Sequence, residues 1–80
     1  MSEEEARRIV VELQHGKRVA VRFRGQQVVI ELSADGRFRK WCLEHTPDGR
    51  REDVEMLTAA EMIDLLIRWY SYDQMMAALQ

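Results

Sequence analysis

The sequence predicts an α+β fold in the order helix, four-stranded antiparallel meander, helix (α-β-β-β-β-α), with a short extra helix at the C-terminal end as an option. Three observations predict it. Apolar and polar residues alternate with a period of two through residues 18–57, glycine-containing turns divide that stretch, and helical apolar periodicity flanks it on both sides. Eighty residues make one domain near the lower size limit for a self-sufficient core. We therefore expect residues 1–80 to form a single small domain.

The first helix begins after Ser2, which forms a capping-box pattern with Glu5. Three consecutive glutamates suit the positive N-terminal end of a helix. Apolar residues follow at the spacing i, i+3, i+4 and i+7, which gives one apolar stripe: Ala6, Ile9, Val10 and Leu13. Gly16 ends this helix.

The first two strands are predicted over Arg18–Arg24 and Gln27–Ser33, where strict alternation gives each strand one buried and one exposed side. Gly25-Gln26 suits a two-residue hairpin loop, because glycine accepts positive φ at the first central position. This loop predicts three apolar cross-strand pairs on one face: Phe23 with Val28, Val21 with Ile30, and Val19 with Leu32.

The third and fourth strands are predicted over Arg37–His45 and Arg50–Leu57. Both preceding connectors end in Asp-Gly, which favours three-residue loops with glycine in the left-handed region. The resulting register pairs Leu32 with Phe38, Val28 with Cys42 and Glu31 with Arg39. It also places Trp41 and Leu43 beside Val29, on the same face as Arg22 and Arg24.

Loop length decides on which side of the sheet Trp41 lies. A two-residue loop would shift the register by one residue and move each side chain to the opposite face relative to its neighbours. The hydrophobic pattern leaves both registers open, since Trp41 and Leu43 would bury as well as Phe38 and Cys42.

The second helix begins after Thr58, which forms a capping box with Glu61. Its broad apolar face is predicted to pack on the sheet. That face consists of Met62, Leu65, Leu66, Trp69 and Tyr70. Ser71 and Gln74 form a third capping pattern, so residues 75–79 are either a short extra helix or the frayed end of one long helix. We expect this tail to pack back on its own domain.

Charge is segregated along the chain. Residues 15–51 carry nine Lys/Arg against four Asp/Glu, whereas the remainder carries three against ten. The pattern predicts a basic sheet between acidic helices. The single cysteine fits a reducing compartment, and no apolar run is long enough to span a membrane, so a cytoplasmic location is expected.

No catalytic set, metal site or cofactor site is predicted, and we do not expect an enzyme. Cys42 and His45 form a Cys-x-x-His pair, but zinc needs four ligands and His15 is the only other histidine. A nucleophilic cysteine needs an oriented base, and strand alternation puts Cys42 and His45 on opposite faces. Each of the four glycines stands singly at a turn or cap, so no phosphate-binding loop is present.

One candidate surface is predicted, the face of the sheet away from the helices. Arginine and tryptophan are the residue types that dominate protein–protein contacts, and they also stack on bases and pair with phosphates. The candidate binding residues are Arg22, Arg24, Val29, Arg39, Trp41 and Leu43.

The first functional hypothesis is a non-catalytic protein-binding module, acting as a small inhibitor, adaptor or subunit on the surface of another protein or complex. Phage-encoded inhibitors of host defence, anti-CRISPR proteins included, belong to this category, although no residue pattern specifies that class. The alternative is a small RNA- or DNA-binding module that uses Lys40 together with the arginines and Trp41. A homodimer through the same face is a third alternative.

Overall fold

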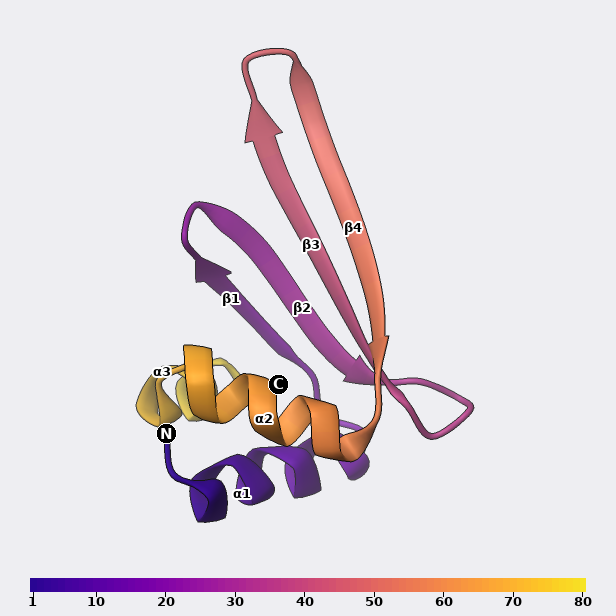
Figure 1. Cartoon of the computed structure of the whole chain (residues 1–80), viewed down its shortest axis with the longest axis vertical. Helices are drawn as coiled ribbons and strands as arrows, with labels where there is room; N and C mark the ends of the chain where they lie inside the picture. Colours follow the sequence, from indigo (N-terminus) through magenta and orange to yellow (C-terminus); the bar gives the residue numbers. More distant parts are fainter.

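The computed structural model describes residues 1–80 and has an α+β fold of one helix, a four-stranded antiparallel sheet and two further helices (Figure 1). The strands follow one another in the sheet in chain order, β1-β2-β3-β4, as a meander. The elements are α1 (Glu3–Gln14), β1 (Val19–Phe23), β2 (Gln26–Leu32), β3 (Phe38–Thr46), β4 (Gly49–Leu57), α2 (Ala59–Trp69) and α3 (Tyr72–Ala78). The predicted fold class is confirmed.

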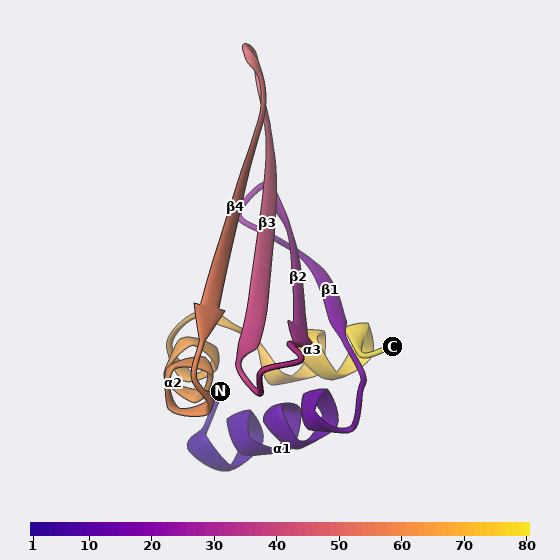
Figure 2. The same cartoon turned by 90° about the vertical axis from the view of Figure 1, so that its right-hand side faces the viewer.

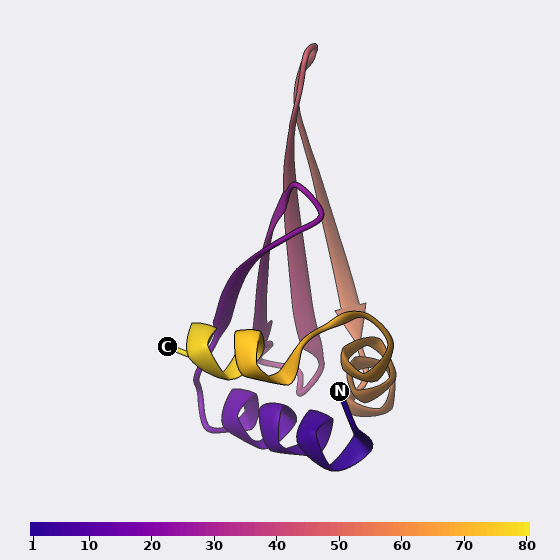
Figure 3. The same cartoon turned by 90° about the vertical axis from the view of Figure 1, so that its left-hand side faces the viewer.

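The three helices gather at one end of the sheet, and the β3–β4 hairpin projects well beyond them (Figures 1 and 2). Both chain ends are attached to this helical end. The Met1 ammonium group donates hydrogen bonds to the carbonyl groups of Ile67 and Tyr70, at 3.3 Å each. At the other end, Leu79 bridges to Val19, which places the C-terminus along the start of β1 (Figure 3).

The core lies between the helices and one face of the sheet, which we call the inner face. The predicted apolar stripe of α1 is buried along its whole length, and it belongs to the same core cluster as the apolar residues of the inner face of the sheet. The buried core residues are Ala6, Ile9, Val10, Leu13, Val19, Val28, Ile30, Phe38, Cys42, Met62, Leu66, Tyr70 and Met75. Helices therefore cover one face only, as the alternation predicts.

The predicted register of the first hairpin is wrong by two residues. Val19 lies opposite Ile30, and Phe23 lies opposite Gln26. The two-residue loop is Arg24-Gly25, in which both residues have positive φ, 50° and 78°. Positive φ at both central positions is the conformation that matches the twist of the flanking strands. Because the error is an even number, the side chains of the paired residues in β1 and β2 stay on their predicted faces.

The β2–β3 connection confirms the predicted register. Phe38 lies opposite Leu32 and Trp41 opposite Val29, and Gly36 has the expected left-handed conformation with φ 86°.

The β3–β4 connection is a two-residue loop, so the prediction of a three-residue loop is wrong there. Thr46 lies opposite Gly49, which leaves only Pro47 and Asp48 between the strands. This register sets Leu57 opposite Phe38, where Leu57 packs against the core. A three-residue loop would turn Leu57 to the other face, so its burial favours the shorter loop.

The predicted helix caps are confirmed. Ser2 with Glu5 and Thr58 with Glu61 both form complete capping boxes. The Ser71 hydroxyl accepts a hydrogen bond from the Gln74 amide at 3.4 Å and begins α3 as a separate short helix. Met75 is fully buried, so the C-terminal tail packs on its own domain as expected.

The predicted core position of Trp69 is wrong, since 48% of its surface is exposed. The chain leaves the helix at Tyr70, whose extended backbone turns that ring inward against Phe23, with ring centroids 4.7 Å apart. Tyr70 therefore occupies the core position, and Trp69 is left at its edge.

Candidate functional site

The face of the sheet opposite the helices, which we call the outer face, carries an apolar row across all four strands. Strand register aligns Ala20, Val29, Trp41 and Val54 from β1 to β4. None of these residues belongs to the core, Trp41 and Val29 are only half-buried, and Val54 is 52% exposed. Side chains directly opposite one another in antiparallel strands are in contact distance. The row is therefore a continuous apolar strip that no helix covers.

Two further rows of the outer face flank this strip. One consists of Arg22, Gln27, Leu43 and Glu52, and the other of Glu31, Arg39 and Met56. Leu43 is 8% exposed although it lies outside the core cluster, so the outer face buries a side chain of its own. Five of the six predicted binding residues thus share one face.

Arg24, the sixth predicted binding residue, lies on the inner side, and its placement beside Trp41 is wrong. Its backbone belongs to the hairpin turn, and its guanidinium carbon is 4.8 Å from the Trp69 ring centroid and 5.2 Å from that of Phe23. The physical reason is the turn itself, because a residue in the left-handed conformation no longer follows the strand alternation.

The Arg24 side chain lines a small hollow of about 190 Å³ at the edge of the core. The other lining residues are Phe23, Lys40, Leu65, Trp69 and Tyr70. A cation over the face of a tryptophan is an attractive contact, so Arg24 joins the first hairpin to the end of α2.

The basic sheet that the sequence predicts is neutralised by the fourth strand. Within the four strands, five Lys/Arg side chains meet five Asp/Glu side chains, because β4 contributes Glu52, Asp53 and Glu55. On the outer face Arg39 lies 3.7 Å from Glu31, and Arg50 lies 3.8 Å from Glu52. Arg22 has no ion-pair partner, which leaves it as the unpaired cation of the outer rows.

Cys42 and His45 are kept apart, as the alternation predicts. Cys42 is in the core, whereas His45 is exposed and lies opposite Arg50 on the outer side. Burial raises the pKa of the Cys42 thiol, with smaller effects of the charges of Lys40, Glu55 and Asp53. A protonated thiol is a poor nucleophile, so this position is suited to packing.

Tyr70 is the most strongly perturbed titratable group. Burial raises the pKa of Tyr70 to about 12, and the charges of Cys42 and Glu55 add to the shift. Its ring packs against Phe23, and its side chain is neutral over the physiological pH range.

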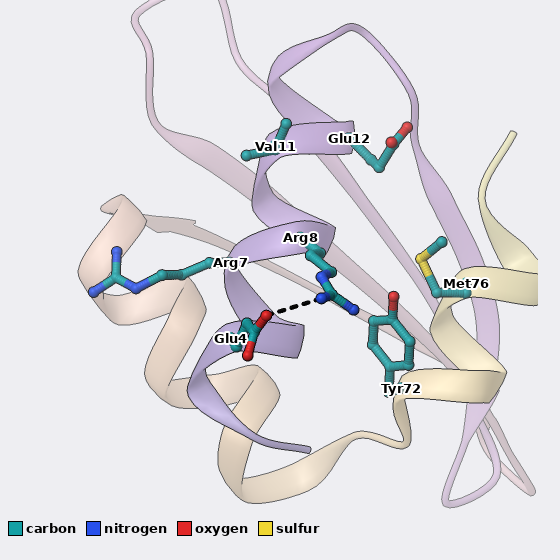
Figure 4. Close-up of a pocket in the computed structure, with 7 residues that line it drawn as sticks. All are labelled: Glu4, Arg7, Arg8, Val11, Glu12, Tyr72 and Met76. Atoms are coloured by element: carbon teal, nitrogen blue, oxygen red, sulfur yellow. Dashed lines mark hydrogen bonds and ion pairs between the residues drawn. The ribbon is translucent and has the colours of Figure 1, made fainter.

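A second hollow, of about 350 Å³, lies between α1 and α3 (Figure 4). Arg8 lies in this hollow, donating to Glu4 at 2.8 Å and pointing toward Tyr72. The neighbouring Tyr72 side chain and, after it, the Glu4 carboxylate raise the pKa of Arg8. The exposed apolar residues Val11 and Met76 line its sides. This hollow was not predicted from the sequence, since Val11 lies off the apolar stripe of α1 and Met76 belongs to a tail that was expected to pack on its own domain.

In comparisons with protein-family models, curated proteins and solved structures, none matches this chain. No helix of the structure is both long and apolar enough to span a membrane.

Proposed function

We propose that this chain is a non-catalytic protein-binding module whose contact surface is the outer face of the sheet. In this role it acts as a small inhibitor, adaptor or subunit. The observation that carries the proposal is the uncovered apolar strip across four strands, with Val54 52% exposed beside Trp41. Exposed apolar strips framed by polar residues are typical of protein contact sites.

Electrostatics favours a protein partner over a nucleic acid. Nucleic-acid affinity comes mainly from cations that neutralise phosphates. On the outer face Arg39 is already close to Glu31, and Arg24 is stacked on Trp69 on the other side. Arg22 alone is unpaired there, which supplies little phosphate attraction. Both signs of charge around an apolar centre are instead the usual arrangement at a protein interface.

Trp41 is the expected anchor of the contact. Tryptophan is enriched among residues that dominate binding energy, especially at the centre of an interface. Trp41 occupies a central strand and lies between Val29 and Val54, so truncating it removes the middle of the strip.

The test is site-specific photo-crosslinking in the cells that produce the protein. A benzoylphenylalanine at position 54 projects from the outer face, and a covalent adduct with a polypeptide is the expected result. Trp41→Glu should abolish the adduct while the far-ultraviolet circular dichroism of the domain is unchanged. Absence of any adduct, or an adduct that Trp41→Glu leaves intact, contradicts the proposal.

A further inference from the structure

The three rows of the outer face change character from one edge of the sheet to the other. The middle row has the small Ala20 on β1 and the larger Val54 on β4, with Val29 and Trp41 between them. The next row begins with a cation, Arg22 on β1, and ends with an anion on β4. The remaining row has an anion on β2 and a cation on β3. When a second copy of the face is turned so that the order of its strands is reversed, large side chains lie over smaller ones and cations lie over anions.

We infer that the polypeptide bound by the outer face is a second copy of this chain, packed face to face about a two-fold axis parallel to the strands. The inference rests on the proposed function and narrows it: with a second copy on the outer face, the chain acts through that face as a subunit of its own dimer and not as an inhibitor or adaptor. The axis runs midway between β2 and β3, so β1 of one copy lies over β4 of the other. Trp41 then lies over Val29 of the second copy, which sets a large side chain against a small one.

The charged rows match under the same operation. Arg22 lies over Glu52 of the second copy, and Arg39 lies over Glu31 of the second copy. The two-fold axis repeats both contacts, which gives four pairs of opposite charge around the apolar strip. Contacts of this kind at a wet rim fix orientation more than they add affinity.

A second two-fold axis between the facing sheets, perpendicular to the strands, gives a poorer match of charges and apolar groups. An axis perpendicular to the strands places each strand over its own copy and exchanges the two flanking rows. Leu43 would then lie over Arg39, and Glu52 over Met56. Each contact desolvates a charge against an apolar group, which is unfavourable.

Edge-to-edge pairing of two sheets is also disfavoured. The β1 edge is occupied at its start by the C-terminal residues, through hydrogen bonds between Arg18 and Gln80. The β4 edge is free, but its charges oppose self-pairing. If two β4 strands pair antiparallel about a two-fold axis, the residue on the axis lies opposite the same residue of the other copy. At Arg50–Asp53, or at Glu55, that residue is charged, so two like charges lie opposite each other. With Val54 on the axis, Asp53 lies opposite Glu55.

The geometry of sheet packing permits these contacts. Facing sheets pack about 10 Å apart, and neighbouring rows of one face are about 7 Å apart. A packing angle of about 30° displaces the flanking rows by roughly 3–4 Å. Arginine and glutamate side chains are long and flexible enough to span that offset.

The size of the face sets the expected affinity. Three rows across four strands cover roughly 20 × 20 Å, so two copies bury on the order of 800 Å². Stable complexes bury about 1,200–2,000 Å², and smaller interfaces are reversible. We therefore expect a dimer that dissociates on dilution, with a Kd in the range from about 1 to about 100 μM.

The experiment is light scattering coupled to size-exclusion chromatography, at loading concentrations from about 5 to about 500 μM. The mass should rise from 9.5 kDa toward twice that value as concentration increases. Arg22→Glu and Glu52→Arg should each raise the Kd about tenfold, because each sets like charges together at two contacts. The double variant restores opposite charges and should return to within about threefold of the wild type.

The matched control reverses a pair on the inner side, Arg51→Glu with Glu44→Arg, whose wild-type atoms are 3.1 Å apart within one chain. This variant should dimerise like the wild type. A mass of 9.5 kDa at every concentration overturns the inference, as does a double variant no better than the single ones. If the chain is monomeric and position 54 crosslinks to a different polypeptide, the inference fails and the proposed function stands. If position 54 gives no adduct, both fail.

Discussion

The assignment of Trp41 to the outer face can be tested by comparing two truncations on the same strand. Phe38→Ala and Trp41→Ala remove aromatic rings that lie three residues apart on β3 and point to opposite faces. Phe38 is 1% exposed and belongs to the core, whereas Trp41 is half-buried outside it.

The expected costs differ because the surroundings differ. Truncating a fully buried phenylalanine costs about 3–5 kcal/mol, from lost transfer energy and the cavity left behind. Trp41 has cross-strand neighbours Val29 and Val54, and such pairs contribute roughly 0.2–1 kcal/mol each. Trp41→Ala should therefore cost about 0.5–2 kcal/mol, despite the larger ring.

The assay is urea unfolding followed by circular dichroism in a long-path cell, at a protein concentration of about 0.1 μM. This is about tenfold below the tightest expected Kd, so most of the protein is monomeric. The slope of free energy against urea should be the same in wild type and variants, so that midpoints compare directly. A cost for Trp41→Ala equal to or above that of Phe38→Ala would refute the face assignment.

Four further predictions concern the helices and the turn. The pKa of Tyr70 is raised from 10.0 to about 12, so the wild type should lose about 2–3 kcal/mol of unfolding free energy as pH rises from 10.0 toward 12. Tyr70→Phe should remove this loss, as measured by unfolding free energies across that pH range. Thr58→Ala should cost about 1 kcal/mol in the same measurement, because its hydroxyl caps α2. The hydrogen bonds of Thr58 also lower the pKa of Glu61, so the stability difference between wild type and Glu61→Gln should be present above pH 4.5 and vanish as pH falls below it. Arg24→Ala should cost about 0.5–1 kcal/mol and red-shift the Trp69 emission in a Trp41→Phe background; an unchanged spectrum would show that Arg24 does not shield the ring.

Sequence periodicity predicted most of the residues that face the core, because alternation in strands and the helical stripe depend only on local geometry. Trp69 is the exception, since the chain leaves the helix just after it. Loop lengths were harder to predict. The connectors before β3 and β4 both end in Asp-Gly, yet Gly36 lies within a loop and Gly49 begins a strand. The deciding contact is Leu57 against the core beside Phe38, which no local pattern contains.

The candidate site was predicted in part for the same reason. The β2–β3 register decides on which face Trp41 and Leu43 lie, and the turn chemistry predicted this register correctly. Val54 and Met56 were missed, because their face depends on the length of the last loop. The predicted basic character failed, since separation of charge along the chain does not persist once β4 pairs with β3.

Photo-crosslinking from two positions compared in the same cells tests the central claim most directly. Val54 lies on the outer face, and Val11 is 45% exposed on the helical side, so the two probes sample opposite sides of the molecule at similar exposure. The account predicts a polypeptide adduct from position 54 that Trp41→Glu abolishes, and none from position 11 that depends on Trp41. An adduct from position 11 alone would contradict it and assign the contact surface to the helices.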